Sequence, residues 1–225
     1  MTLTILLVDD HQMMREGLRA ILEKVDNYLV VGEAGSGREA VRLVRELSPD
    51  IVVMDVAMSD MNGIEATREI RANAPATQVV ALSSYSDRRY VAAILAAGAC
   101  AYVLKTDAYA ELQRAVDAAS QHMKYLCAGV TSEVIESALQ SGTDGSVYEL
   151  LAPREREVLQ LLAEGLTSSE MAKHLGVATS TIETHRKNIM RKLDVHNVAE
   201  LTKYAIREGL TSLEEGSHRG SETSS

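Results

Sequence analysis

Three aspartates stand where hydrophobic runs end, and this position makes them the first candidates for chemistry. Asp9 and Asp10 follow the apolar run at residues 5–8, and Asp55 follows the run at 51–54. Such runs are typical of buried strands. Carboxylates gathered at one edge of a sheet repel each other unless a cation neutralises them. Oxygen-only ligands suit Mg²⁺, which takes one or two carboxylates and keeps places for water and a phosphate oxygen. The pattern therefore predicts a magnesium site.

Two further residues complete a set that can transfer a phosphoryl group. Ser83 and Lys105 also end apolar runs, so they are expected at the same edge of the sheet. Phosphoryl transfer depends on positioning and on charge neutralisation. Asp55 is the candidate nucleophile, Asp10 and Asp55 are the candidate metal ligands, and Asp9 reaches the metal through water. Lys105 supplies a cation and Ser83 a hydroxyl for the phosphoryl oxygens.

Strands that alternate with helices must position these side chains. Between the apolar runs lie segments with helical spacing, and the runs themselves fall at residues 3–8, 29–32, 51–56, 79–82 and 101–104. This alternation predicts a flavodoxin-like, doubly wound α/β domain with a five-stranded parallel sheet over residues 1–122. Its ligand site is expected beyond the carboxyl ends of the strands. His11 is interpreted as the start of a helix rather than as a ligand.

The rest of the chain divides into a linker, a helical domain and a tail. Residues 123–149 are expected to be a linker that contains one short helix, near residues 131–139. Residues 150–212 contain four helical segments with capping signals, such as Thr167 followed by Glu170, and predict an all-α domain. From Glu214 onward no residue is apolar, so residues 213–225 are predicted to be a disordered tail.

One helix of the second domain, at residues 180–193, concentrates basic side chains. Ile182, Ile189 and Leu193 fall on one face of it. The opposite face carries Ser180, Thr184, Lys187, Asn188 and Arg191. A capped helix at residues 167–175 precedes it, and this succession is typical of a helix-turn-helix whose second helix enters the DNA major groove. For this helix taken alone, a merely solvated basic face is the alternative.

The motifs of the first domain resemble a known family. They are LLVDDH at 6–11, VVMDVAMSDMNG at 52–63, ALSS at 81–84 and AYVLK at 101–105. In order and spacing, from residue 1 to about 122, they are similar to the receiver domain of bacterial two-component response regulators. The resemblance implies that Asp55 is the phosphoacceptor for a sensor histidine kinase and that the backbone carbonyl of Ala57 completes the Mg²⁺ site. It also implies that Ser83 and Tyr102 form a switch.

Four positions depart from the usual receiver pattern or leave it open. Ser59 stands where proline is usual, so the loop after the phosphoacceptor is expected to be less stiff. Thr106 replaces a proline that often follows the lysine, so no cis peptide is expected there. Ala57 and Tyr85 occupy positions where polar side chains orient a hydrolytic water. We therefore expect a long-lived phosphoryl group, and a half-life of seconds would contradict this.

Residues 151–193, continuing through HNVAELTKYAI, resemble the LuxR-type (NarL/FixJ) DNA-binding domain over its whole length. The resemblance implies six side chains on DNA, the first three at bases and the others at or near phosphates: Glu183, Thr184, Lys187, Arg186, Asn188 and Arg191. The last helix, with Val198, Leu201 and Ala205 on one side, resembles the helix through which such domains pair. Ala152 and Ala178 stand where Ser or Thr usually caps a helix, at a cost of about 1 kcal/mol each.

Charge and composition limit the classes of function. Residues 1–125 carry 13 basic and 17 acidic side chains, and residues 150–212 carry 9 and 8, so the acidic excess lies outside the helical domain. This small charge predicts modest, salt-sensitive DNA affinity that depends on pairing two copies. No membrane span or signal peptide is expected, which favours a cytoplasmic protein. Cys100 and Cys127 are too few for a disulfide framework.

The favoured hypothesis is a phosphorylation-dependent transcriptional regulator. It dimerises when phosphorylated, binds DNA and acts on RNA polymerase. The alternative is a Mg-dependent enzyme with an aspartyl-phosphate intermediate and a C-terminal protein-interaction module, but the sequence offers no general acid for Asp55. A regulator that binds DNA whether or not it is phosphorylated is disfavoured, because all the residues needed for phosphoryl transfer are present: Asp9, Asp10, Asp55, Ser83 and Lys105. The kinase, its signal, the operator, the domain arrangement and the sign of regulation are left open.

Overall fold

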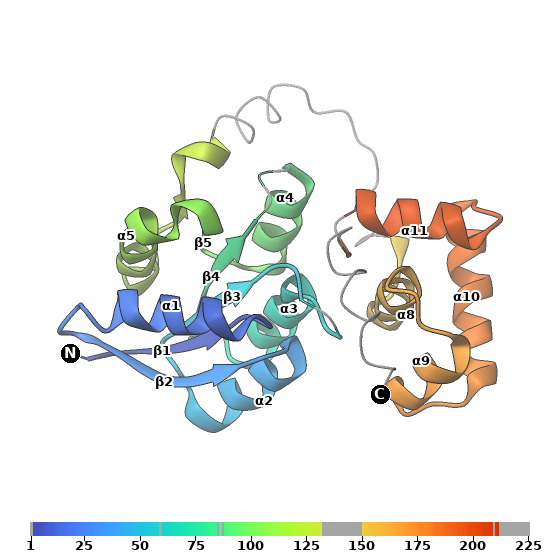
Figure 1. Cartoon of the computed structure of the whole chain (residues 1–225), viewed down its shortest axis with the longest axis horizontal. Coiled ribbons are helices and arrows are strands. Elements are labelled where there is room, and N and C mark those ends of the chain that lie inside the picture. Colours follow the sequence, from blue (N-terminus) through green and yellow to red (C-terminus); the bar gives the residue numbers. More distant parts are fainter. Residues whose placement is uncertain are drawn as a thin grey trace, which may run out of the picture. The chain divides into compact units, whose positions relative to one another are not determined.

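Two compact units make up the chain, residues 1–142 and 143–225 (Figure 1). The computed structural model describes residues 2–58, 60–84, 86, 88–131, 150–208 and 210–211, without the side chains of Arg88, Arg89 and Arg207. The expected linker helix near residues 131–139, apart from Thr131, and the expected tail at 213–225 lie outside these residues. None of the described helices is long and apolar enough to cross a membrane.

The first unit is built on a parallel sheet in the order β2-β1-β3-β4-β5-β6. Its strands are β1 Leu3–Val8, β2 Tyr28–Ala34, β3 Ile51–Asp55, β4 Gln78–Ser83, β5 Ala101–Leu104 and β6 Tyr125–Leu126. The five predicted strands are confirmed as the core of the sheet, and the structure adds a short sixth strand, β6, which pairs in parallel with β5. Its two residues leave no apolar run in the sequence. The sheet therefore extends beyond the expected boundary at residue 122.

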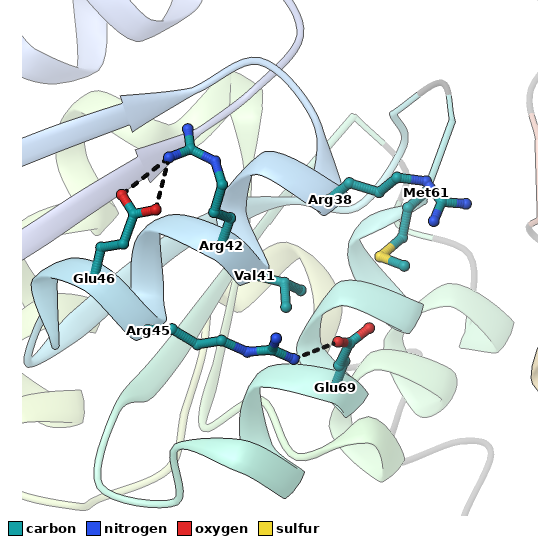
Figure 2. Close-up of a pocket in the computed structure, with 7 residues that line it drawn as sticks. All are labelled: Arg38, Val41, Arg42, Arg45, Glu46, Met61 and Glu69. Atoms are coloured by element: carbon teal, nitrogen blue, oxygen red, sulfur yellow. Dashed lines mark hydrogen bonds and ion pairs between the residues drawn. The ribbon is translucent and has the colours of Figure 1, made fainter. Parts of the chain in front are cut away.

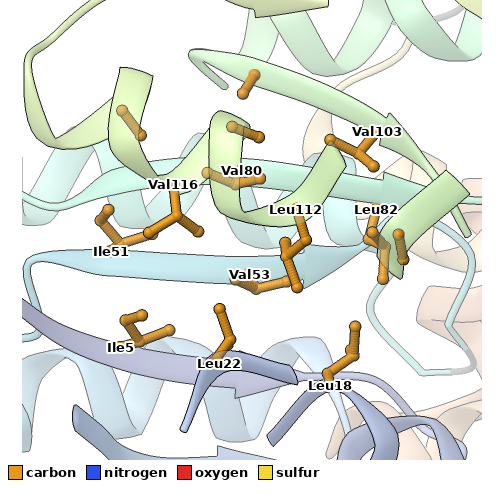
Figure 3. Close-up of a cluster of buried hydrophobic side chains, with 14 of the residues drawn as sticks. Ile5, Leu18, Leu22, Ile51, Val53, Val80, Leu82, Val103, Leu112 and Val116 are labelled. Carbon is orange, nitrogen blue, oxygen red and sulfur yellow. The ribbon is translucent and has the colours of Figure 1, made fainter. Parts of the chain in front are cut away.

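Helices cover both faces of this sheet. They are α1 Gln12–Leu22, α2 Gly37–Leu47, α3 Gly63–Asn73, α4 Arg88–Ala97 and α5 Ala108–Ser120, the last preceded by the 3₁₀ turn η1 Lys105–Asp107. Figure 3 shows Leu18 and Leu22 of α1 and Leu112 of α5 packed over the buried strands. The other three helices, α2, α3 and α4, contact the sheet from its opposite face, where α2 packs against α3 and α3 against α4. The fold is the predicted doubly wound α/β arrangement.

Local sequence signals explain where several helices begin and end. The Ser36 side chain accepts a hydrogen bond from the backbone N–H of Glu39 at 3.3 Å, as the capping box predicts. Asn62 does the same for Glu65 at 3.0 Å and starts α3 beside the strand end of Asp55. His11 occupies the N-cap position of α1, which confirms its interpretation as a helix start.

The second unit contains the four predicted helices in its described part: α8 Pro153–Ala163, α9 Ser168–Leu175, α10 Thr179–Leu193 and α11 Val198–Arg207. Val158, Ile182, Ile189 and Leu201 are fully buried and belong to its own hydrophobic core. Thr167 and Glu170 form the predicted capping box at α9, and Gly176 ends that helix with φ +65°. The helix-turn-helix scaffold is thus in place.

The two predicted weak caps differ in their consequences. Ala152 has no side-chain acceptor, but the Glu155 carboxylate accepts from the Ala152 N–H at 2.8 Å, so half of a capping box remains at α8. Ala178 precedes α10 with an extended backbone and no side-chain cap. The first turn of α10 therefore lacks the side-chain acceptor that a hydroxyl at this position would supply.

We expect Ala178→Ser to raise the free energy of unfolding of the second unit by about 1 kcal/mol, because a serine hydroxyl at this N-cap accepts a backbone N–H. Urea unfolding of the full chain measures it. Ala92→Ser is the matched control, since it puts the same hydroxyl at an exposed position inside α4, where a slight loss of stability is expected. An unchanged or lower stability for Ala178→Ser would show that α10 begins elsewhere.

Candidate functional site

Strand register brings the predicted residues to one edge of the sheet. Asp9 follows β1, Asp55 ends β3, Ser83 ends β4 and Lys105 follows β5, and these four strands are neighbours in that order. The paired positions are Val8 with Met54, Asp55 with Leu82 and Ser83 with Leu104. Four elements that are distant in sequence thus contribute to one site, at the carboxyl ends of the strands.

The acidic residues form a close cluster. One ligand atom from each of Asp9, Asp10, His11 and Asp55 lies within 4.8 Å of all the others. Asp9 and Asp55 are 0% and 1% exposed, whereas the His11 side chain is 65% exposed, with Nδ1 2.8 Å from Asp10 Oδ1. The ammonium of Lys105 lies 2.8 Å from Asp9 Oδ2 and 2.8 Å from Asp55 Oδ2. One lysine therefore faces two buried carboxylates.

Burial and charge act against each other at this site. Burial raises the pKa of Asp55 to about 7, although Lys105 pulls it down. Burial by itself lowers the pKa of Lys105, but the Asp55 and Asp9 carboxylates raise it on balance. The three aspartates exceed the charge of the one lysine, so the donor set fits a divalent cation that binds oxygen ligands. A cation there would favour the ionised, nucleophilic form of Asp55.

Replacing Lys105 by glutamine is expected to raise Mg²⁺ affinity about tenfold, because an ammonium that competes for the same carboxylates is removed. Phosphorylation should be at least about tenfold slower, because a cation that stabilises the transferring group is lost. Calorimetric Mg²⁺ titration and a phosphorylation time course measure the two effects. Lys124→Gln, at an exposed position, is the control, and weaker Mg²⁺ binding by Lys105→Gln would contradict the assignment.

The predicted switch residues are in contact. Ser83 and Tyr102 are fully buried, and a side-chain hydrogen bond joins them. Burial raises the pKa of Tyr102. The backbone carbonyl of Tyr102 accepts from the N–H of Cys127 at 3.1 Å, directly after β6. Ala57 donates its N–H to Asp55 Oδ1 at 3.3 Å. Ser59 and Tyr85, which bear on loop stiffness and phosphoryl lifetime, lie outside the described residues.

Gly63 is a site residue whose role the sequence reasoning missed. A Cβ at this position would lie 1.9 Å from the backbone oxygen of Asp55. The Gly63 N–H also donates to the carbonyl of Val56 at 2.9 Å. Only glycine lets α3 approach the end of β3 this closely. The available signal was a glycine directly after the capping residue Asn62 in the motif that follows Asp55.

A separate pocket lies between α2 and α3 and contains none of the clustered aspartates. Figure 2 shows its lining: Arg38, Val41, Arg42, Arg45, Glu46, Met61 and Glu69. Its arginines are already paired with carboxylates, for example Arg42 with Glu46 at 2.9 Å and Arg45 with Glu69 at 2.9 Å. Their charges are therefore largely compensated, and we assign the pocket no part in phosphoryl transfer.

The helix predicted to enter DNA, α10, has the expected two faces. Ile182 and Ile189 are buried in the core, while Thr184, Lys187 and Arg191 are exposed. Lys192, near its C-terminal end, pairs with the buried Glu155 of α8 at 2.6 Å. This ion pair fixes α10 against α8.

Of the three residues expected to form a pairing surface, Val198, Leu201 and Ala205, the structure places two inside the second unit. Leu201 and Ala205 are fully buried in the core of their own unit, where α11 packs on α8. A residue buried in this way has no surface left for a second copy. Val198 is 43% exposed and is the only one of the three that remains a candidate. A helical stripe indicates burial but does not distinguish a domain core from an interface.

A buried cluster of aspartates with one lysine at the carboxyl edge of a doubly wound sheet, joined to a helix-turn-helix, is typical of regulators with an input and an output domain. Residues 5–117 match the model of the response regulator receiver domain, and residues 149–205 match that of bacterial regulatory proteins of the luxR family. The chain belongs to the two-component response regulators with a LuxR-family helix-turn-helix, and it is a transcriptional regulator rather than a turnover enzyme.

Relatives that align over nearly the whole chain support this membership. The chain is 41% identical to the transcriptional regulatory protein LiaR of Bacillus subtilis, over 92% of its own length and 98% of LiaR. It is 34% identical to the response regulator VraR of Staphylococcus aureus, over 93% and 99%. Among solved structures, one of two RcsB dimers bound to two parallel DNAs is 26% identical with a TM-score of 0.58, over 92% and 99% of the two chains.

Proposed function

We propose that Asp55 accepts a phosphoryl group from a sensor histidine kinase and that this event controls binding of a dimer to specific DNA. The observation that carries the proposal is the geometry around Asp55. Its carboxylate is buried at the edge of the sheet and shares the Lys105 ammonium with Asp9, and burial raises its pKa to about 7. A buried carboxylate with an excess of neighbouring negative charge is suited to bind a cation and to become covalently modified.

Each strand-end residue has a role in this proposal. Asp10, Asp55 and the backbone carbonyl of Ala57 would hold Mg²⁺, with Asp9 reaching it through water. The metal would neutralise charge on the phosphoryl oxygens. A carboxylate oxygen of Asp55 attacks phosphorus, and the bond from phosphorus to the nitrogen of the donor histidine breaks. Lys105, now 2.8 Å from Asp55 Oδ2, would then pair with a phosphoryl oxygen.

The output would begin at Ser83 and Tyr102. A phosphoryl group on Asp55 offers new acceptor oxygens to the Ser83 hydroxyl, which is now hydrogen-bonded to Tyr102. Breaking that bond would change the packing around Tyr102. It would thereby raise the population of a conformation of the first unit whose surface can dimerise. Because Leu201 and Ala205 are buried, any pairing through α11 would use its outward face, which includes Val198. Pairing on DNA is consistent with the dimers of the related RcsB.

The DNA contacts are proposed for α10, at Thr184, Lys187, Asn188 and Arg191. The regulated machinery would be RNA polymerase in the cytoplasm.

The phosphoryl group is proposed to be long-lived. Ala57 has no polar side-chain atom to orient a water for hydrolysis. A phosphoryl half-life of seconds in the purified protein would argue against this part.

DNA selection from a random duplex library, with and without a small-molecule phosphodonor and Mg²⁺, tests the proposal. We expect one consensus of two half-sites to be enriched strongly with the phosphodonor and weakly without it. Identical enrichment in both arms would refute control by phosphate. If neither arm yields a consensus, the proposed DNA binding by this chain is wrong.

A further inference from the structure

Three side chains of the second unit form a contact that ties α9 to α10. Ser168, the first residue of α9, donates its hydroxyl hydrogen to the Glu183 carboxylate. Arg186 Nη1 lies 3.2 Å from the same Glu183 oxygen and 3.0 Å from Ser168 Oγ. Glu183 and Arg186 are one turn apart on α10, so one carboxylate joins a hydroxyl of one helix to a guanidinium of the other.

Neighbouring side chains of α10 are engaged differently. Thr184 turns its hydroxyl toward the helix and donates to the carbonyl of Ser180 at 2.9 Å, which leaves its methyl group outward. Lys187 is exposed and makes no hydrogen bond or ion pair within the described part of the chain. An outward methyl suits the methyl group of thymine, and a lysine suits the acceptors of guanine.

Glu183 is poorly placed to read a base. Ser168 and Arg186 both contact its Oε1 and hold the carboxylate at α9, so reaching a cytosine amino group with the other oxygen would mean moving the side chain away from that helix. The hydrogen bond from Ser168, followed by the nearby Arg186 guanidinium, lowers the pKa of Glu183. Releasing either partner would leave an ionised group without its compensation, and Arg186 is only 26% exposed on its side chain.

We propose that Glu183 and Ser168 are positioning residues, which hold Arg186 on the α9 side of the recognition helix and compensate its charge, while Thr184 and Lys187 select bases. This inference rests on the proposed DNA binding and reassigns the base contact that the family resemblance implied for Glu183. It follows that Arg186 contributes less than one full phosphate contact to the salt dependence of binding.

The test uses the full chain with phosphodonor and Mg²⁺, and duplex selection followed by affinity measurements at several salt concentrations. In Glu183→Gln the amide oxygen still accepts from Ser168, but the charge that compensates Arg186 is gone. We expect the selected consensus sequence to be unchanged. The slope of the logarithm of the binding constant against the logarithm of the salt concentration should be steeper by up to about 0.9, which is the contribution of one phosphate contact. Lys187→Ala, the comparison variant, should lose preference at one base pair of each half-site.

Substitutions of Ser168 provide an independent test in which no charge of the protein changes. Ser168→Ala should bind the same consensus about threefold more weakly, and Ser168→Thr, which retains the hydroxyl, should restore the affinity. A changed base preference in Glu183→Gln, or a salt dependence equal to that of the wild type, would overturn the positioning role. Wild-type affinity in Ser168→Ala would overturn the part assigned to Ser168. Failure of the wild type to select any consensus would instead refute the proposed DNA binding.

Discussion

Replacing Asp55 by asparagine is expected to abolish phosphorylation of the chain and, with it, the phosphodonor-dependent gain in DNA affinity. The amide is a poor nucleophile and carries no charge for a divalent cation, although its shape is nearly that of aspartate. Lys105 now contacts two carboxylates, and the exchange leaves it only that of Asp9. Intact-mass spectrometry after incubation with a small-molecule phosphodonor and Mg²⁺ measures the loss.

The matched control for this exchange is Asp60→Asn. Asp60 lies in the same loop after β3, and its carboxylate contacts Arg38 at 2.8 Å. Its φ of +74° is a conformation that asparagine tolerates well. We expect this variant to be phosphorylated like the wild type. Full phosphorylation of Asp55→Asn at another residue, with regulation intact, would show that Asp55 is not the acceptor.

Gly63→Ala is expected to damage the phosphoryl site severely, although Gly63 carries no functional group. The added Cβ would lie 1.9 Å from the Asp55 backbone oxygen, so either the end of β3 or the start of α3 must move. Overpacking of this kind costs about 1–3 kcal/mol. Displacing Asp55 by even about 1 Å should slow phosphorylation by about 100-fold. Urea unfolding and a phosphorylation time course measure the two effects.

Gly17→Ala is the control, because a Cβ at Gly17, inside α1, has nothing within 4 Å. Alanine is the better helix former, so this variant should be about 0.5–1 kcal/mol more stable and should be phosphorylated normally. Wild-type phosphorylation of Gly63→Ala, at wild-type stability, would mean that the close approach of α3 to β3 is unimportant for the site.

The strand-end residues of the site could be predicted from the sequence because the strands follow from local patterns and a doubly wound sheet gathers the ligand-binding residues at their carboxyl ends. Asp9, Asp55, Ser83 and Lys105 each end a short apolar run, and parallel strands place such ends together. β6 could not be predicted, because its two residues, Tyr125 and Leu126, are too few to leave a strand pattern in the sequence. Gly63 was missed because its importance depends on the carbonyl of a residue in another element.

In the second unit the sequence predicted the helices and their faces, but not the partners of particular side chains. The apolar spacing of α11 correctly marked Leu201 and Ala205 as one side of a helix, and only the packing of α11 on α8 shows that this side is internal. Likewise, the family resemblance implied a base contact for Glu183. Its partner Ser168 lies on a different helix, and periodicity cannot reveal contacts between helices.

The central claim, that phosphorylation at Asp55 controls DNA binding, is tested most directly by one affinity ratio. Fluorescence anisotropy would give the affinity of the full chain for its selected duplex, at one fixed salt concentration, with and without phosphodonor and Mg²⁺. We predict that the phosphodonor tightens binding of the wild type by at least about tenfold, which is within the usual range of allosteric coupling, and leaves Asp55→Asn unchanged. Equal affinities of the wild type in both conditions would contradict it.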